Sequence, residues 1–139
     1  MTETCKELNL PAELERLPEL TSFLEEELEE AGCPLRTRMQ ISVAAEEIFV
    51  NIASYAYLSR TGAATVRLAI SNDPTTATIT FIDSGIPFNP LKKEDPDVRL
   101  TANKRQIGGL GIYMTKKTMD DVRYEYRDGQ NRLTLIKKI

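Results

Sequence analysis

The chain has 139 residues, of which 41% are hydrophobic and 28% are charged, and its formal net charge is −3. These values are ordinary for a soluble globular protein, and we expect residues 1–139 to form one domain. The sequence contains no histidine, which excludes a Ser-His-Asp triad, a Cys-His pair, imidazole metal ligands and a phosphohistidine. Proton transfer by this chain must use carboxylate, Lys, Tyr or Cys groups.

The cysteines and the charge distribution bear on the compartment and the partners. Cys5 and Cys33 form no CxxC pair, and neither a signal peptide nor a membrane-spanning run is evident. We therefore expect a cytoplasmic protein without membrane contact. Residues 1–91 carry 6 basic and 14 acidic residues, whereas residues 92–139 carry 12 and 7. The acidic part argues against direct nucleic-acid binding. The basic part suits a small anion, although solvated surface charge is the ordinary alternative.

The first third of the chain predicts a strand and two helices. Residues 4–10 alternate weakly as a strand, which Pro11 ends. Apolar residues at helical spacing over 14–31 predict a helix with an acidic opposite face, and Gly32 ends it. A second helix is predicted over 35–58. Its apolar stripe consists of Ile41, Ala44, Ala45, Ile48, Ile52 and Ala56.

The rest of the chain changes to a period of two. Residues 66–70 and 79–83 predict a hairpin. A long loop over 84–108 follows, and a helix opens at the glycines near residue 109 and runs to about 119. Two final strands, over 122–126 and 133–135, are joined at Asp128-Gly129. This order predicts an α+β fold, a two-layer sandwich in which helices cover one face of a mixed, antiparallel-rich sheet.

Acidic and amide side chains lie together on the second predicted helix. Glu46 and Glu47 are adjacent, and Asn51 follows Glu47 by four residues, so these two share a helix face. A carboxylate and an amide facing one way can serve as a general base and a metal ligand. The alternative is a polar helix edge with a hydrogen-bonded asparagine.

Two glycine-containing segments could contact a nucleotide. In Asp83-Ser84-Gly85-Ile86-Pro87, the Asp can accept a hydrogen bond from an exocyclic amine, and Gly85 lets a flat ring approach the backbone. An Asx turn at a strand end is the alternative. Gly108-Gly109-Leu110-Gly111 opens a helix, where free N–H groups favour an anion, or it forms only a glycine hinge. It is neither a P-loop nor a Rossmann fingerprint.

The order of these motifs resembles the N, G1 and G2 boxes of the GHKL (Bergerat-fold) ATPase superfamily. Within it, the chain is most similar to the anti-sigma-factor serine kinases. The N box corresponds to ISVAAEEIFVNIASYAY, the G1 box to IDSGIPFNPL, and the G2 box with its helix to GGLGIYMTKKTMDDV. The resemblance covers nearly the whole chain, and three boxes in order are more specific than any one of them.

The resemblance implies a role for individual residues in the N and G1 boxes. Glu47, rather than Glu46, matches the general base, and Asn51 matches the residue that binds Mg²⁺. Asp83 matches the residue that accepts from the adenine amine, and Gly85 the glycine that lets the ring sit close. Pro87 belongs to the same ATP-binding block.

The resemblance also implies roles toward the phosphates. The turn that cradles them corresponds to Gly108, Gly109, Leu110 and Gly111, and residues 88–108 correspond to the ATP lid. Lys104 and Arg105 lie at the end of this lid, where they could meet the γ-phosphate. Thr134 of the last strand is a further candidate that would support the adenine.

The function implied is an ATP- and Mg²⁺-dependent protein serine kinase that acts as an anti-sigma factor. Its partners would be a sigma factor and, as substrate, a STAS-type anti-sigma-factor antagonist; members of the family commonly form homodimers. Many of them carry a histidine four residues after the Asn, where this chain has Tyr55. The alternatives are a non-catalytic, ATP-gated binding module, a kinase domain with another substrate, and a structural domain without a ligand.

Overall fold

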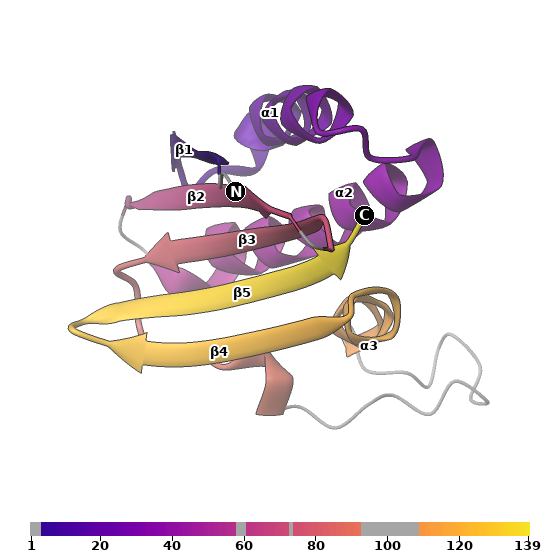
Figure 1. Ribbon diagram of the computed structural model, residues 1–139. Helices are drawn as coiled ribbons and strands as arrows, with labels where there is room; N and C mark the ends of the chain where they lie inside the picture. Colours follow the sequence, from indigo (N-terminus) through magenta and orange to yellow (C-terminus); the bar gives the residue numbers. More distant parts are fainter. Residues whose placement is uncertain (1–3, 58–60, 73, 93–108) are drawn as a thin grey trace.

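The computed structural model describes residues 4–57, 61–72, 74–92 and 109–139, which form a five-stranded sheet with helices on one face (Figure 1). The strands are β1 (Thr4–Pro11), β2 (Ala63–Ser71), β3 (Thr76–Asp83), β4 (Asp121–Arg127) and β5 (Gln130–Lys138). The α-helices are α1 (Leu17–Glu30), α2 (Leu35–Asn51) and α3 (Gly109–Thr118). Shorter helical turns cover Leu14–Arg16, Ile52–Ala56 and Pro90–Lys92. The element order and the α+β class agree with the prediction.

The strands are arranged in the order β1-β2-β3-β5-β4, so the last strand of the chain lies inside the sheet. Every pairing among the described strands is antiparallel. In the β3–β5 ladder, Asp83 pairs with Asn131 and Thr80 pairs with Thr134. Because successive side chains alternate between faces, this register decides which residues of β5 face the helices.

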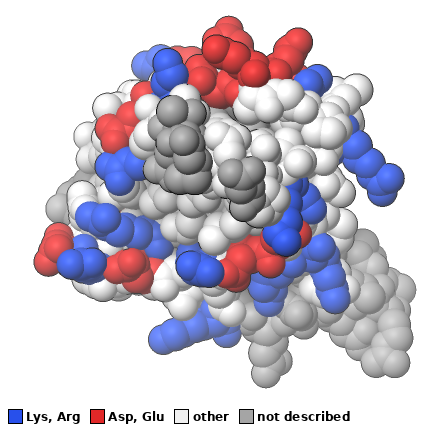
Figure 2. All heavy atoms as spheres, in the orientation of Figure 1, with Lys and Arg blue, Asp and Glu red and all other residues white. Residues whose placement is uncertain are grey.

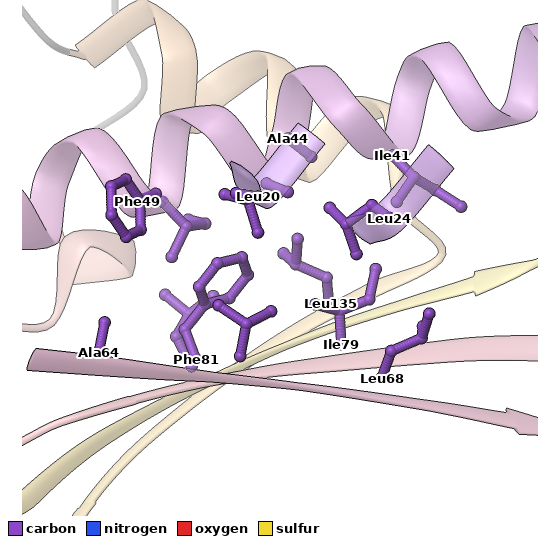
Figure 3. Packing of buried hydrophobic residues seen from close by; sticks show 14 of the residues in the cluster. Leu20, Leu24, Ile41, Ala44, Phe49, Ala64, Leu68, Ile79, Phe81 and Leu135 are labelled. Carbon is purple, nitrogen blue, oxygen red and sulfur yellow. The ribbon is translucent and has the colours of Figure 1, made fainter. Parts of the chain in front are cut away.

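The core lies between the sheet and the helices (Figure 3). The predicted apolar stripes supply it: Leu20, Leu24 and Leu28 of α1 are fully buried. The six stripe residues predicted for the second helix are all buried as well. They pack against inward-facing strand residues such as Val66, Leu68, Ile79, Phe81 and Leu135. Helix α2 packs against both α1 and α3, so it is the central helix of this layer.

The second helix changes its hydrogen-bonding pattern where the sequence predicted one continuous helix. Regular α-helix ends at Asn51, and residues Ile52–Ala56 form a π-helical turn. Tyr57 fixes the end of this turn, because its hydroxyl donates to the carbonyl of Ala63 (2.6 Å) and accepts from the Ser84 N–H (2.8 Å). π-Turns are found often at functional sites. The widened turn places the carbonyl of Ala56 beside the end of β3.

The turn between β4 and β5 forms as predicted. Asp128 and Gly129 have φ values of 54° and 76°, and two successive positive values fit the right-handed twist of a two-residue hairpin. One group of acidic side chains lies over α1, at the top of the molecule in Figure 2, and others are spread over the same face. None of the described helices is long and apolar enough to cross a membrane.

Candidate functional site

The two adjacent acids of α2 point to different helices. Glu46 faces α1, where its Oε1 lies 3.5 Å from the hydroxyl of Thr21, which donates to it. Glu47 faces α3, and its carboxylate lies against the backbone of Gly111. The helical rotation of 100° per residue separates the two side chains in this way. The carboxylate that reaches the glycine turn is therefore that of Glu47.

Gly111 leaves the space that the Glu47 carboxylate occupies. A Cβ atom at this position would lie 1.9 Å from Oε1 and 2.2 Å from Cδ of Glu47. Helix α3 begins at Gly109, so this contact lies in its first turn. The N–H groups of a first helical turn have no partner within the helix and favour an anion. A carboxylate and an anion-binding helix terminus thus meet at one point.

Asn51 lies one turn after Glu47, and its amide nitrogen is buried without a hydrogen-bond partner among the described residues. A buried amide without a partner suits a residue that pairs with a ligand, since buried polar groups are nearly always bonded. Its carbonyl oxygen is a hard donor of the kind that Mg²⁺ takes, usually with water and substrate phosphates as the other ligands. Asn51 therefore fits the magnesium role, and the described residues include no cluster of three acidic, Cys or His side chains that competes for a metal.

The end of β3 is fixed by hydrogen bonds to the Asp83 carboxylate. Asp83 is 5% exposed, and its Oδ1 accepts from the Gly85 N–H and from the Asn131 side-chain amide, both at 2.9 Å. Gly85 packs directly on the π-turn, since a Cβ there would lie 2.2 Å from the Ala56 carbonyl oxygen. The Ile86 N–H donates to that same oxygen (2.9 Å). Only glycine fits Gly85's position without movement of backbone.

Asn131 organises the pocket, although the sequence analysis did not single it out. Its amide nitrogen donates to Asp83 and to the Ile86 carbonyl (2.8 Å). Its oxygen accepts from the Phe88 N–H (3.1 Å) and from the Tyr124 hydroxyl. Burial raises the pKa of Tyr124, which keeps the phenol protonated as a donor. In the sequence, Asn131 is only a polar residue after a hairpin turn. No local pattern indicates that it pairs with Asp83 across the sheet.

Asn51, Asp83 and Asn131 line one pocket at the end of the sheet. It has a volume of about 30 Å³. Its walls include Asn51, Ala56, Phe81, Asp83, Phe88 and Asn131. A space of this size holds a few water molecules, so a purine base requires the walls to separate. Phe88 is the wall next to the long loop, and its ring packs against Tyr55 with centroids 5.8 Å apart.

The structure corrects the expectation for Thr134. Its hydroxyl lies 3.4 Å from that of Thr80, its partner across the ladder. Leu133 and Leu135 on either side of it are buried in the core, so Thr134 is on the opposite face, away from the helices and the pocket. Asn131, three residues earlier, takes the place in the pocket.

The remaining predicted site residues lie at the start of the long loop or beyond the described part. Pro87 borders a hollow next to the pocket, together with Phe88 and Tyr124. Gly109 and Leu110 are described as the first residues of α3. Gly108, Lys104 and Arg105, with residues 93–108 of the predicted lid, lie outside the described residues.

The family model of the histidine kinase-like ATPase domain matches residues 10–137, which include every element that builds the pocket. The chain belongs to the histidine kinase-like ATPase domain family. This membership implies that the domain binds ATP, and it confirms the superfamily that the three sequence boxes indicated.

Two known proteins are similar to this chain. The chain is 28% identical over 100 residues to the serine/threonine-protein kinase BtrW of Bordetella bronchiseptica, covering 72% of this chain and 70% of BtrW. The fold matches the crystal structure of the RsbU and RsbW domains of Rv1364c from Mycobacterium tuberculosis, with a TM-score of 0.70 and 18% identity. That match covers 97% of this chain and 32% of the chain in the crystal structure, so this chain spans about a third of the length of that structure's chain.

Proposed function

We propose that this chain is an ATP-dependent protein serine kinase that also binds a sigma factor, and that its substrate is a STAS-type anti-sigma-factor antagonist. The observation that carries the proposal is the contact between Glu47 and Gly111. Of the two adjacent acids, only Glu47 faces α3. The contact places its carboxylate at the helix terminus where phosphates would bind. The kinase name of the Bordetella relative supports the choice of phosphoryl transfer.

In the proposed reaction the serine hydroxyl of the substrate attacks the γ-phosphorus of ATP. The bond between the γ-phosphorus and the β–γ bridging oxygen breaks, a bond to the serine oxygen forms, and ADP leaves. Glu47 accepts the hydroxyl proton, a role that requires a carboxylate within hydrogen-bond reach of the attacking group. Phosphoryl transfer depends mainly on positioning and charge stabilisation, so the chain needs little further covalent chemistry.

The other pocket residues hold the nucleotide in this proposal. Asp83 accepts from the adenine amine, and Gly85 provides a surface without a side chain on which the ring rests. Asn51 holds Mg²⁺, which would neutralise charge on the phosphates. The N–H groups at the start of α3 bind phosphate oxygens, and Arg105 would add a positive charge from the lid. Because the chain lacks histidine, the phosphoryl group passes to the substrate rather than to an imidazole of this chain.

The test is transfer to a purified STAS-domain protein chosen from the genome that encodes this chain, in the presence of Mg²⁺ and ATP. We expect phosphoserine on that protein by mass spectrometry. Glu47→Gln should lower the transfer rate by about 100-fold or more, the usual contribution of a general base. Glu46→Gln is the matched control and should transfer normally, because Glu46 faces α1. Both variants should bind ATP as the wild type does. Unchanged transfer by Glu47→Gln would contradict the assignment.

A second function is a binding module that uses ATP as a signal without turnover. The contact between Tyr55 and Phe88 favours it, because Phe88 is a wall of the ATP pocket and movement of this wall would reach the exposed Tyr55. In that case ATP would change the affinity for a partner while no phosphate is transferred. Tight ATP binding with no transfer to the STAS protein would favour this function over the kinase.

A further inference from the structure

A concentration of exposed apolar side chains lies between α2 and α3. Leu35, Met39 and Val43 follow one another at four-residue spacing on α2 and are 60%, 59% and 63% exposed. Met114 of α3 is 46% exposed. These are four of the eight large apolar side chains that are exposed in the described part of the chain. Such a patch on one face marks an interaction site more often than scattered apolar residues do.

The patch forms a groove of about 460 Å³, which we name the α2–α3 groove. Its main wall residues are Leu35, Met39, Val43, Met114, Thr115 and Thr118. The two threonine hydroxyls are already bonded to carbonyls of α3, Thr115 to Gly111 (2.9 Å) and Thr118 to Met114 (3.0 Å). The α3 wall therefore offers a ligand an apolar surface. A nucleotide or sugar would find few polar partners there, whereas apolar side chains of a protein would bury well.

The groove leads to the proposed catalytic carboxylate. Glu47 follows Val43 by four residues on α2, and Gly111 precedes Met114 by three on α3. Because Glu47 contacts Gly111, the two walls of the groove converge at the atoms that would activate a serine. When the acceptor serine of a substrate lies at Glu47, the residues next to that serine can lie along the apolar groove.

A positive charge lies at the end of the groove that is farther from Glu47. Arg36 is exposed, and among the described residues that line the groove it is the only charged one. It lies eleven residues before Glu47 on the same helix, a separation of about 16 Å along the axis. An acidic side chain of a partner at this end would be complementary to Arg36, and complementary charges set the register of docking.

We propose that the α2–α3 groove is the docking site of the protein substrate. The occupant is a segment of the substrate that carries the acceptor serine at one end, apolar side chains along its length, and an acidic residue that meets Arg36. This inference rests on the proposed kinase function and adds to it the surface that selects the substrate. The groove and the pocket around Asp83 share no wall residue, so the two can be changed separately by mutation.

The experiment places a negative charge in the groove with Val43→Glu and, separately, Met39→Glu. Both positions are well exposed, so the fold should tolerate the change, which circular dichroism and ATP affinity will verify. The probe is the same STAS-domain protein that is used to test the kinase activity. We expect its KM to rise at least tenfold and its affinity for the chain loaded with a non-hydrolysable ATP analogue to fall at least tenfold. The KM for ATP should stay within twofold. Leu14→Glu, at another exposed apolar position, is the matched control.

The outcomes separate the groove from the kinase activity. If the wild type transfers phosphate and the two groove variants match it in substrate KM and affinity, the groove proposal is overturned and the kinase stands. If the wild type binds the STAS protein without transfer and the variants lose binding, the groove stands and the kinase assignment fails. A wild type that neither binds nor transfers overturns both. If the variants lose only self-association in sedimentation velocity, a second copy covers the groove and the proposal is wrong.

Discussion

The two ends of the proposed ATP pocket, where Asp83 would meet the adenine and α3 the phosphates, are built differently. At the adenine end, the Asp83 carboxylate and the Asn131 amide are joined to each other and to backbone groups by a network of hydrogen bonds. At the phosphate end, the Asn51 amide nitrogen is buried without a partner among the described residues, and Glu47 lies against a helix terminus. The protein satisfies its own polar groups at the proposed adenine end, whereas at the proposed phosphate end the Asn51 amide nitrogen is left to a ligand.

This difference separates stability from function within one pocket. Groups bonded to each other contribute to the folded state, and their removal leaves buried donors without acceptors. A buried polar group that is bonded only when a ligand is present destabilises the ligand-free protein. Its removal therefore affects binding or catalysis rather than stability. Substitutions at the two ends should therefore have different consequences for the free energy of unfolding.

The largest effect is expected at the adenine end. Asp83→Ala removes the acceptor of the Gly85 N–H and of the Asn131 amide, and it should lower the free energy of unfolding by about 2–4 kcal/mol. ATP binding should be lost as well. Urea denaturation and calorimetry measure the two effects.

Asp120→Ala is the matched control for that substitution. Asp120 also accepts from a backbone N–H, that of Lys138 (2.6 Å), but it is exposed, so water replaces the lost bond. We expect a loss below about 1 kcal/mol. Equal losses for Asp83→Ala and Asp120→Ala would mean that burial of the network contributes nothing.

The opposite sign is expected at the phosphate end. Asn51→Leu replaces a partly buried amide, whose nitrogen has no partner among the described residues, with an apolar side chain of similar size. The free energy of unfolding should rise by up to about 1 kcal/mol, because a buried polar group is removed. Mg²⁺-dependent ATP binding should nevertheless be lost in calorimetry. A clear loss of stability in this variant would show that the amide is already satisfied in the folded chain.

Gly111→Ala should affect catalysis with little effect on stability. The added methyl would meet the end of the Glu47 side chain, which can rotate away, and alanine also favours a helix over glycine by about 1 kcal/mol. Unfolding should change by less than about 1 kcal/mol. The displaced carboxylate should lower phosphoryl transfer about tenfold or more, since general-base catalysis depends on position. The rate of phosphoryl transfer, measured in quenched time points, checks this expectation. A rate equal to that of the wild type would contradict the role of the contact.

The smallest effect concerns the pH dependence of stability. Burial raises the pKa of Tyr124 above its ordinary value of 10.0, so the folded chain retains a proton that the unfolded chain releases. This contribution to stability is complete below about pH 10 and is lost as the pH rises through the raised, folded-state pKa. Denaturation between pH 8 and 11 should show a decline that Tyr124→Phe reduces. Tyr55→Phe is the control, because Tyr55 is exposed and is not among the groups that raise the pKa of Tyr124.

The sequence by itself determined the elements and most of the candidate site. The 3.6-residue stripes of α1 and α2, the alternation of the strands and the glycine at the β4–β5 turn are local signals, and each produced the expected element. Glu47, Asn51, Asp83 and Gly85 could be chosen because their motifs, in this order, resemble the three boxes of a known superfamily. The family match over residues 10–137 agrees with that choice of superfamily.

Tertiary structure alone decided the partners across the sheet and between the helices. Insertion of β5 between β3 and β4 sets Asn131 opposite Asp83 and turns Thr134 to the other face, and a single-residue shift of register would reverse this. The packing of α3 on α2 brings Gly111 to Glu47 rather than to Glu46. These contacts join residues distant in sequence, and their geometry depends on packing that no local pattern encodes.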